Sequence, residues 1–409
     1  MTSAPVTLES IQAARAHIRD AVALTPCPES IPLSEITGAR IFCKLDCFQR
    51  TGSFKERGAR NALSQLDAAR RQRGVIAASA GNHALGLAYH GSLLGIPVTV
   101  VMPKTAPLIK SATCARLGAR VVLHGETFAE ARAHADALAA REQLTYIHGY
   151  DDPAIIAGQG TMALEILEQV PDVEAVVAPI GGGGLIAGLA VALKSLRPQV
   201  RVIGVEAKAT ASFQAALAAG RPVPVECGHT LADGLAVSIV GANAFVLARE
   251  RIDHIVTVTE DQLALAILRM LELEKMVVEG AAAAPLAAFM TGTLPELHGR
   301  TCVLCFGGGN IDPVVLGRVI EKGLVADGRL GRFTAVISDR PGGLARLAQA
   351  IAETGASIRE VNHDRAFAGA DVSAVRVVVT IETRDHDHLA SVLRHLRETP
   401  GIELPATET

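Results

Sequence analysis

The stretch Ser53-Phe54-Lys55-Glu56-Arg57-Gly58-Ala59 decides how this sequence is interpreted, because it places one lysine at the start of a predicted helix. The turn Thr51-Gly52 precedes it, and an Ala-, Leu- and Arg-rich run reaches Leu66. The positive end of a helix disfavours an ammonium group and favours the neutral amine. A neutral lysine amine condenses with aldehydes, so Lys55 is a candidate for covalent catalysis. A solvated, salt-bridged lysine would show the same local pattern, so other motifs have to distinguish the two interpretations.

Composition is typical of a globular protein with large hydrophobic cores. The chain has 409 residues, 49% hydrophobic and 20% charged, with a formal charge of −3, which is enough for two or three domains. The near-neutral charge without a basic stripe argues against nucleic-acid binding, and no apolar run reaches membrane-spanning length. The N-terminus lacks the apolar core of a secretory signal. We therefore expect a cytoplasmic protein with no nucleic-acid or membrane partner.

The seven cysteines are scattered. Cys302 and Cys305 have CxxC spacing, but no second pair accompanies them and both fall inside an apolar run. This pattern is typical of buried strand thiols rather than of a zinc or redox site. No metal site is predicted.

Short β-branched runs alternate with Ala- and Leu-rich helices over about the first 320 residues. Strands that are apolar on both faces, alternating with helices, indicate an α/β fold of parallel sheets wrapped by helices. This length is too great for one such sheet, so we expect two lobes with a cleft between them, the smaller at about 50–150. The predicted strands are residues 74–79, 97–101, 119–123, 175–178, 201–205 and 301–305.

The C-terminal part has a different rhythm. Residues 322–331 are rich in glycine and charge and are predicted to be a linker between a domain at 1–321 and a separate one at 332–409. The later order, β-α-β-β-α-β, is that of a ferredoxin-like unit. Its predicted elements are residues 333–337, 341–353, 356–365, 371–381, 386–397 and a short strand near 402.

Three glycine-containing turns each follow a predicted strand. Ser79-Ala80-Gly81-Asn82-His83 opens a helix, where backbone N–H groups suit a substrate carboxylate. Gly181-Gly182-Gly183-Gly184 has no Cβ to keep its amides from an oxyanion, which indicates a phosphate cradle. The third turn is Cys305-Phe306-Gly307-Gly308-Gly309-Asn310-Ile311-Asp312. Plain helix caps and tight turns are the simpler alternatives for the first and third.

The glycine run also has a second interpretation. Gly182-x-Gly184, with Glu206 ending the next predicted strand, imitates a dinucleotide fingerprint. The third glycine, Gly188, falls one residue late. A nicotinamide oxidoreductase therefore stays as the weaker alternative.

Together these residues resemble the threonine dehydratase (threonine ammonia-lyase) family of fold-type-II pyridoxal phosphate enzymes. The matching segments follow the family order across about 300 residues. The stretch Asp339-Arg340-Pro341-Gly342-Gly343-Leu344 resembles an ACT domain, a ferredoxin-like module that commonly binds small effectors. The resemblance is carried by residues 44–46, 49–59, 79–83, 157–161, 181–184 and 308–310.

The resemblance implies pyridoxal 5′-phosphate as cofactor, held by Lys55 as a Schiff base with Phe54 packed on its ring. Asn82 would bond the cofactor 3′ oxygen, and the loop of Ser79, Ala80, Gly81 and His83 would receive the substrate carboxylate. The phosphate would be held by Gly181, Gly182, Gly183 and Gly184.

The implied reaction is α,β-elimination of water from a small β-hydroxy amino acid, with Lys55 as general base for the Cα proton. L-threonine would give 2-oxobutanoate and ammonia. Dehydratases of serine, hydroxyaspartate or phenylserine type and serine racemase are the alternatives within the family. A non-catalytic effector-binding protein is disfavoured because Lys55 and the glycine run are intact.

Three departures from the wider family bear on this expectation. Ala80 stands where serine racemases have a serine acid/base, which favours elimination over racemisation. Ser212 stands where the racemase cation site would pair a carboxylate with Glu206. Gly307 replaces the serine that partners the pyridine nitrogen in most members, with Cys305 the nearest thiol.

The ACT-like segment suggests regulation. A glycine-rich helix start offers free N–H groups to an effector carboxylate, so Asp339, Pro341, Gly342, Gly343 and Leu344 are the candidate contacts. A simple helix-initiating turn is the alternative. A homo-oligomer, dimer or tetramer, is expected because ACT strands commonly pair between chains.

Overall fold

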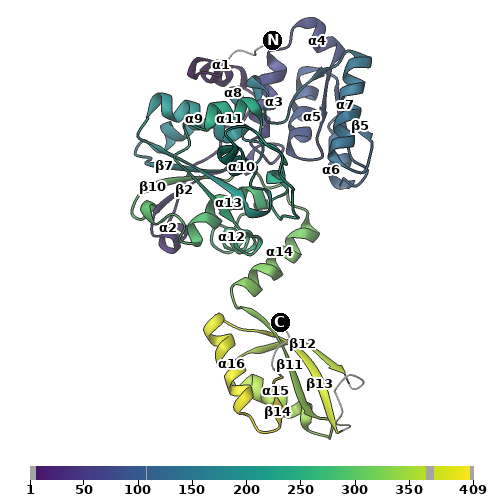
Figure 1. Ribbon diagram of the computed structural model, residues 1–409, viewed down its shortest axis with the longest axis vertical. Helices are drawn as coiled ribbons and strands as arrows, with labels where there is room; N and C mark the ends of the chain where they lie inside the picture. The colour runs from purple at the N-terminus through teal and green to yellow at the C-terminus, as the bar shows by residue number, and fades with distance from the viewer. Residues whose placement is uncertain (1–5, 107, 365–372, 406–409) are drawn as a thin grey trace. The chain divides into compact units, whose positions relative to one another are not determined.

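The computed structural model describes residues 6–106, 108–364 and 373–405 (Figure 1). The chain separates into two compact units, one up to Asp312 and one from Pro313 on. Among the described residues, no helix is both long enough and apolar enough to cross a membrane.

The first unit contains a six-stranded sheet in the order β1-β2-β10-β7-β8-β9. All neighbours are parallel except β1 and β2. Every residue of the central strands β7 and β10 is buried, as expected for a parallel sheet covered on both faces. The strands are β1 (Glu29–Ser30), β2 (Arg40–Lys44), β7 (Ala175–Pro179), β8 (Arg201–Ala207), β9 (His254–Val258) and β10 (Thr301–Cys305).

A four-stranded, entirely parallel sheet forms the smaller lobe, in the order β5-β4-β3-β6. Side chains of β3 alternate between two cores: Val75 and Ala77 pack with the cluster around α3 and α5, whereas Ile76 and Ala78 pack against α7. This period of two places helices on both faces of the sheet. The strands are β3 (Val75–Ala78), β4 (Val98–Met102), β5 (Arg120–Leu123) and β6 (Thr145–Tyr146).

Helices cover both sheets of the first unit (Figure 1). Helix α9 contacts β7 and β8 of the large sheet and packs with α8 and α11. Helix α13 contacts β7, β8, β9 and β10 of the same sheet. The helices are α1 (Leu8–Ile18), α2 (Ile31–Thr37), α3 (Lys55–Ser64), α4 (Ala68–Arg73), α5 (Asn82–Leu94), α6 (Leu108–Arg116), α7 (Phe128–Glu142), α8 (Pro153–Gln169), α9 (Gly184–Leu196), α10 (Ser212–Ala219), α11 (Ala242–Ala248), α12 (Glu260–Leu273) and α13 (Gly280–Met290).

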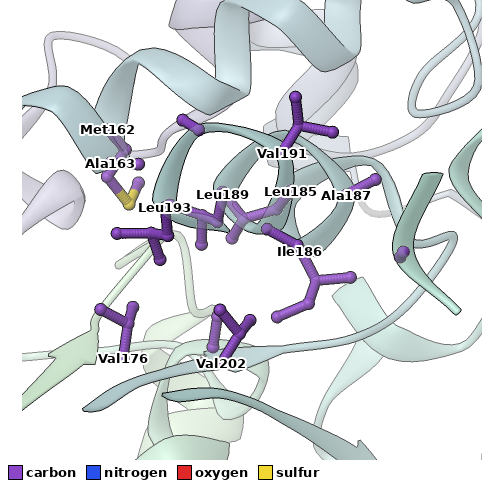
Figure 2. Close-up of a cluster of buried hydrophobic side chains, with 14 of the residues drawn as sticks. Met162, Ala163, Val176, Leu185, Ile186, Ala187, Leu189, Val191, Leu193 and Val202 are labelled. Atoms are coloured by element: carbon purple, nitrogen blue, oxygen red, sulfur yellow. The ribbon is translucent and has the colours of Figure 1, made fainter. Parts of the chain in front are cut away.

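The core of the larger lobe lies between α9 and the sheet. Figure 2 shows Ile186 of α9 directed toward the strands that carry Val176 and Val202. Leu189 and Leu193 of the same helix are also completely buried. Truncating one such leucine to alanine costs about 2–5 kcal/mol, so this core anchors the start of α9, where the glycine run lies.

The second unit has the predicted β-α-β-β-α-β order, and its antiparallel sheet runs β12-β13-β11-β14. The α/β fold with a ferredoxin-like C-terminal module is thereby confirmed. Parts of two predicted strands, residues 365 and 371–372, lie outside the described residues. The elements are α14 (Pro313–Ala326), β11 (Leu330–Ser338), α15 (Gly343–Glu353), β12 (Ser357–Asp364), β13 (Ala374–Glu382), α16 (His386–Glu398) and β14 (Ile402–Glu403).

The segment 322–331 is more regular than its composition suggests. Helix α14 continues to Ala326, and β11 begins at Leu330. Gly323 is buried inside the helix, and only Gly328, with φ of +68°, has the left-handed backbone that favours glycine. The linker at 322–331 and the domain limits stay predictions.

Candidate active site

Lys55 is the first residue of α3, directly after Phe54 at the N-cap position. Its Nζ atom donates to the carbonyl oxygen of Gly149 at 2.7 Å and lies 5.2 Å from the centre of the Phe54 ring. Burial lowers the pKa of Lys55 to about 8, against the opposing influence of the Glu279 carboxylate. The amine is therefore far closer to neutrality at physiological pH than an ordinary lysine.

The turn before Lys55 is hydrogen-bonded to the loop that follows β10. The Phe54 N–H donates to the Gly307 carbonyl at 2.8 Å, and the Gly309 N–H donates to the Gly52 carbonyl at 2.9 Å. A Cβ on Gly52 would lie 2.4 Å from Oδ1 of Asn310, and its φ is +75°. Only glycine fits this close approach, so the loop and the lysine turn are held as one piece.

Asn82 begins α5 and meets two residues that are distant in the sequence. Its Nδ2 lies 2.8 Å and 3.1 Å from the two carboxyl oxygens of Glu279, and its Oδ1 accepts from Nδ2 of Asn310 at 2.9 Å. Gly308 packs against this group, because an added Cβ would lie 2.3 Å from Oε1 of Glu279. Sequence reasoning missed Glu279, whose one visible signal is a single carboxylate in front of the apolar run Gly280–Met290.

The glycine run connects β7 to α9. Gly183 has φ of +89°, and a Cβ on Gly182 would lie 2.2 Å from the ring of Tyr150. Within the described residues, the N–H groups of Gly181, Gly182 and Gly183 donate to no backbone oxygen and no side chain. Tyr150 directly follows Gly149, so one short segment touches both the glycine run and the Lys55 amine.

The loop from Ser79 to His83 lies at the carboxyl end of β3. The Gly81 N–H donates to Oγ of Ser79 at 3.2 Å, and a Cβ on Gly81 would meet no atom within 4 Å. Ala80 packs against the core of the smaller lobe. Open space therefore lies over Gly81, next to the amides of a helix start.

His83 is buried behind this loop, with Nε2 3.1 Å from the Ile147 carbonyl oxygen. Burial and the nearby Lys55 lower its pKa to about 3. A carbonyl oxygen only accepts, so Nε2 donates and the ring is neutral. His83 supports the loop and offers no titrating proton near neutral pH.

The two candidates for the pyridine nitrogen differ in surroundings. Cys305 is completely buried in the core cluster that also contains Cys27, and burial strongly raises the pKa of its thiol. Gly307 faces Phe54, since a Cβ there would lie 3.0 Å from the ring. The role of either residue stays a prediction.

Glu206 has a structural partner set of its own. Its carboxyl oxygens accept the N–H groups of Phe213 at 2.7 Å and Gln214 at 2.9 Å, at the first turn of α10. Burial raises the pKa of Glu206 to about 7. Among the described residues, no group of three or more His, Cys, Asp or Glu side chains is arranged to hold a metal ion.

A buried ion network lies behind Lys55 on the same helix. Arg57 pairs with Asp46 at 2.6 Å and with Glu165 at 2.6 Å, and Lys44 pairs with Glu165 at 2.6 Å. Two cations thus balance two anions. The network joins β2, α3 and α8 and fixes the helix that begins with the lysine.

The candidate effector residues surround the start of α15. Gly342 has φ of +97°, and a Cβ on Gly343 would lie 2.0 Å from the Ser338 carbonyl oxygen. The Asp339 N–H donates to the Ser373 carbonyl at 2.9 Å, and Leu344 is 44% exposed. Their regulatory role stays a prediction.

Comparison with known proteins agrees with this geometry and confirms the predicted resemblance. The L-threonine ammonia-lyase of Thermotoga maritima is 42% identical over 391 residues, which cover 96% of this chain and 97% of that protein. Threonine deaminase isoform 2 of Solanum lycopersicum, in its processed form, gives a TM-score of 0.74 at 37% identity, covering 78% of this chain and 90% of that chain. Serine racemase of Dictyostelium discoideum gives 0.71 at 32% identity, covering 76% and 100%.

Two family models also match, one for each unit of the structure. The ACT-domain model covers residues 331–403. The other covers residues 18–308, and by it the chain belongs to the family of pyridoxal-phosphate dependent enzymes.

Proposed function

We propose that this protein is a threonine ammonia-lyase that eliminates water from L-threonine and yields 2-oxobutanoate and ammonia. The observation that carries the proposal is the partly buried Lys55 amine, bonded to the Gly149 carbonyl at the start of α3. Support for the substrate comes from the relatives that are named for threonine and match nearly the whole chain.

The residues present fit pyridoxal 5′-phosphate. The unbonded N–H groups of Gly181, Gly182 and Gly183 lie at a helix N-terminus, the usual cradle for a phosphate group. Lys55 supplies an amine of lowered pKa for the aldehyde. Asn82 would face the phenolic oxygen, and the Phe54 ring would lie beside the pyridine ring.

When bound, the cofactor supplies an electron sink that makes the substrate Cα proton acidic. Lys55, as a neutral amine, takes this proton and holds it. The N–H groups at the start of α5 would receive the substrate carboxylate above Gly81, where the structure leaves open space. The β-hydroxyl leaves as hydroxide and combines with the proton that Lys55 took from Cα, so that one water is lost. Hydrolysis of the released enamine then gives the 2-oxo acid and ammonia.

Serine racemase activity is the main alternative, because one similar structure carries that name. Racemisation needs a proton donor on the face of the substrate opposite Lys55. Ala80 offers only a methyl group at the position that the resemblance assigns to this donor. Elimination is therefore the favoured outcome.

The C-terminal unit supports regulation by a small effector. We infer that a catalytic domain (1–321) carries out the elimination and that an ACT-like domain (332–409) binds the effector, with a linker between them at 322–331. The effector would contact Asp339 to Leu344, and the working form would be a homo-oligomer.

The direct test is to supply purified holoenzyme with L-threonine, L-serine, hydroxyaspartate and phenylserine. The expected result is 2-oxobutanoate from L-threonine with the highest kcat/KM. Chiral analysis of the L-serine reaction should find pyruvate without D-serine. A higher kcat/KM for another substrate, or D-serine forming as fast as pyruvate, would overturn the assignment.

A further inference from the structure

Glu279 stands at the N-cap position of α13, yet its side chain does not cap the helix. An N-cap side chain normally accepts a backbone N–H of the first turn. Here the carboxyl turns to Asn82 and also accepts the backbone N–H of Asn310. The residue is only 6% exposed, and within the described part of the chain it forms no ion pair. A buried carboxyl without a cation is costly, and helix capping does not explain it.

The geometry around Asn82 shows what this carboxyl does. Nδ2 of Asn82 donates to Glu279, while Oδ1 accepts from Asn310 at 2.9 Å. Asn310 is itself oriented, because its Nδ2 also donates to the Thr51 carbonyl at 2.7 Å. Rotating the Asn82 amide by half a turn would set oxygen against carboxyl oxygen and N–H against N–H. Glu279 and Asn310 thus admit a single orientation of the amide.

We propose that Glu279 is a positioning residue of the elimination reaction, which holds the Asn82 amide in the orientation that presents an N–H to the cofactor's phenolic oxygen. The proposal rests on the proposed function for its cofactor. It assigns a task to a residue that contacts neither the lysine nor the glycine run through a hydrogen bond. It also explains the glycine at 308, where a Cβ would displace the carboxyl.

The electrostatic surroundings suit this task. Burial raises the pKa of Glu279 to about 7, Asp233 acts in the same direction, and Asn82, Lys110 and Asn310 oppose it. Lys110 and Asp233 form an ion pair at 3.0 Å, and Lys55 is the other nearby charge. A carboxyl that holds its proton in part resembles an amide, so glutamine can take over the accepting role, whereas leucine cannot.

The test is a double-mutant cycle on cofactor binding. Apoenzymes carrying Glu279→Leu, Glu279→Gln, Asn82→Ala and the double change Glu279→Leu/Asn82→Ala are titrated with pyridoxal phosphate, and the visible absorbance of the bound cofactor is recorded. Glu279→Leu should weaken cofactor binding about tenfold or more and shift the absorbance, since a hydrogen bond to a charged group is lost. Glu279→Gln should stay within about threefold of wild type. In the Asn82→Ala background, Glu279→Leu should change the affinity by less than about twofold.

Two outcomes would overturn the proposal: full effects of Glu279→Leu in the Asn82→Ala background, or no effect in the wild-type background. Glu274→Leu, five positions earlier and outside the site, is the matched control and should leave affinity and spectrum unchanged. If Glu279→Leu fails to fold, Asn310→Ala removes the other contact to the amide and enters the same cycle. All of these measurements omit the amino-acid substrate, so a wrong substrate assignment would leave the cycle intact.

Discussion

The Lys55 amine and the Gly149 carbonyl oxygen are 2.7 Å apart, although 94 positions separate them in the chain. Gly149 is followed by Tyr150, whose ring occupies the space where a side chain at Gly182 would stand. The lysine and the glycine run are therefore joined through two consecutive residues. This segment therefore contacts both parts of the proposed cofactor site.

Lys55→Ala should abolish covalent cofactor binding, because no other lysine of the described residues is hydrogen-bonded to the Gly149 carbonyl. We expect the loss of the borohydride-trapped adduct and a fall in elimination rate of about 10³-fold or more, as for removal of a nucleophile or general base. Lys104→Ala, an exposed lysine, is the control. Turnover in Lys55→Ala above one-tenth of wild type would contradict the assignment of the catalytic lysine.

The pH dependence of reconstitution follows from the Lys55 pKa of about 8, lowered by burial. The amine is protonated below this pH and neutral above it, and only the neutral form attacks the aldehyde. The rate at which apoenzyme takes up pyridoxal phosphate should therefore rise with pH and level off above about 8, measured by stopped-flow absorbance. Free lysine side chains would keep gaining reactivity up to about 10.4, so a rate that keeps rising to pH 10 would contradict the lowered pKa.

The periodic parts of the fold could be predicted from the sequence because burial on both sheet faces leaves an apolar signature. The strands β3, β4, β7 and β10 are of this kind, since every residue in them is buried. In the ferredoxin-like unit, β11 and β13 instead alternate between buried and less buried residues. Glu279 could not be found, since its partner Asn82 lies 197 positions away and a lone carboxylate has no local motif. Gly149 acts through its backbone carbonyl, which no residue type marks. Helix α14 was not predicted, because the glycine and charge at 322–331 were taken to indicate a linker.

The buried ion network should be far more sensitive than a surface pair on the same helix. Arg57→Met leaves Asp46 and Glu165 with only Lys44 as a buried cation, and this should lower the free energy of unfolding by about 3–5 kcal/mol. Arg15→Met breaks the pair with Glu168 of α8, whose side chains are 41% and 56% exposed, and should cost about 0–1 kcal/mol. Urea unfolding of the two variants decides it, and equal losses would show that the network contributes no more than a surface pair.

The last prediction concerns the C-terminal unit. All the residues of the proposed cofactor site precede Pro313, and the ACT-like sheet has its own core around Phe333, Ile351 and Val377. A chain ending at Val325 should therefore bind pyridoxal phosphate and eliminate water, while losing its response to effectors. Branched-chain amino acids and nucleotides would be titrated into both forms, with elimination rate as the readout. Coupling between effector and active site is typically about 1–3 kcal/mol, or roughly 5–150-fold in affinity. In the full chain, Gly343→Val should abolish the same response, because the added side chain would collide with the Ser338 carbonyl and displace the N–H groups at the start of α15. Identical effector responses in the full and shortened chains would show that regulation lies elsewhere.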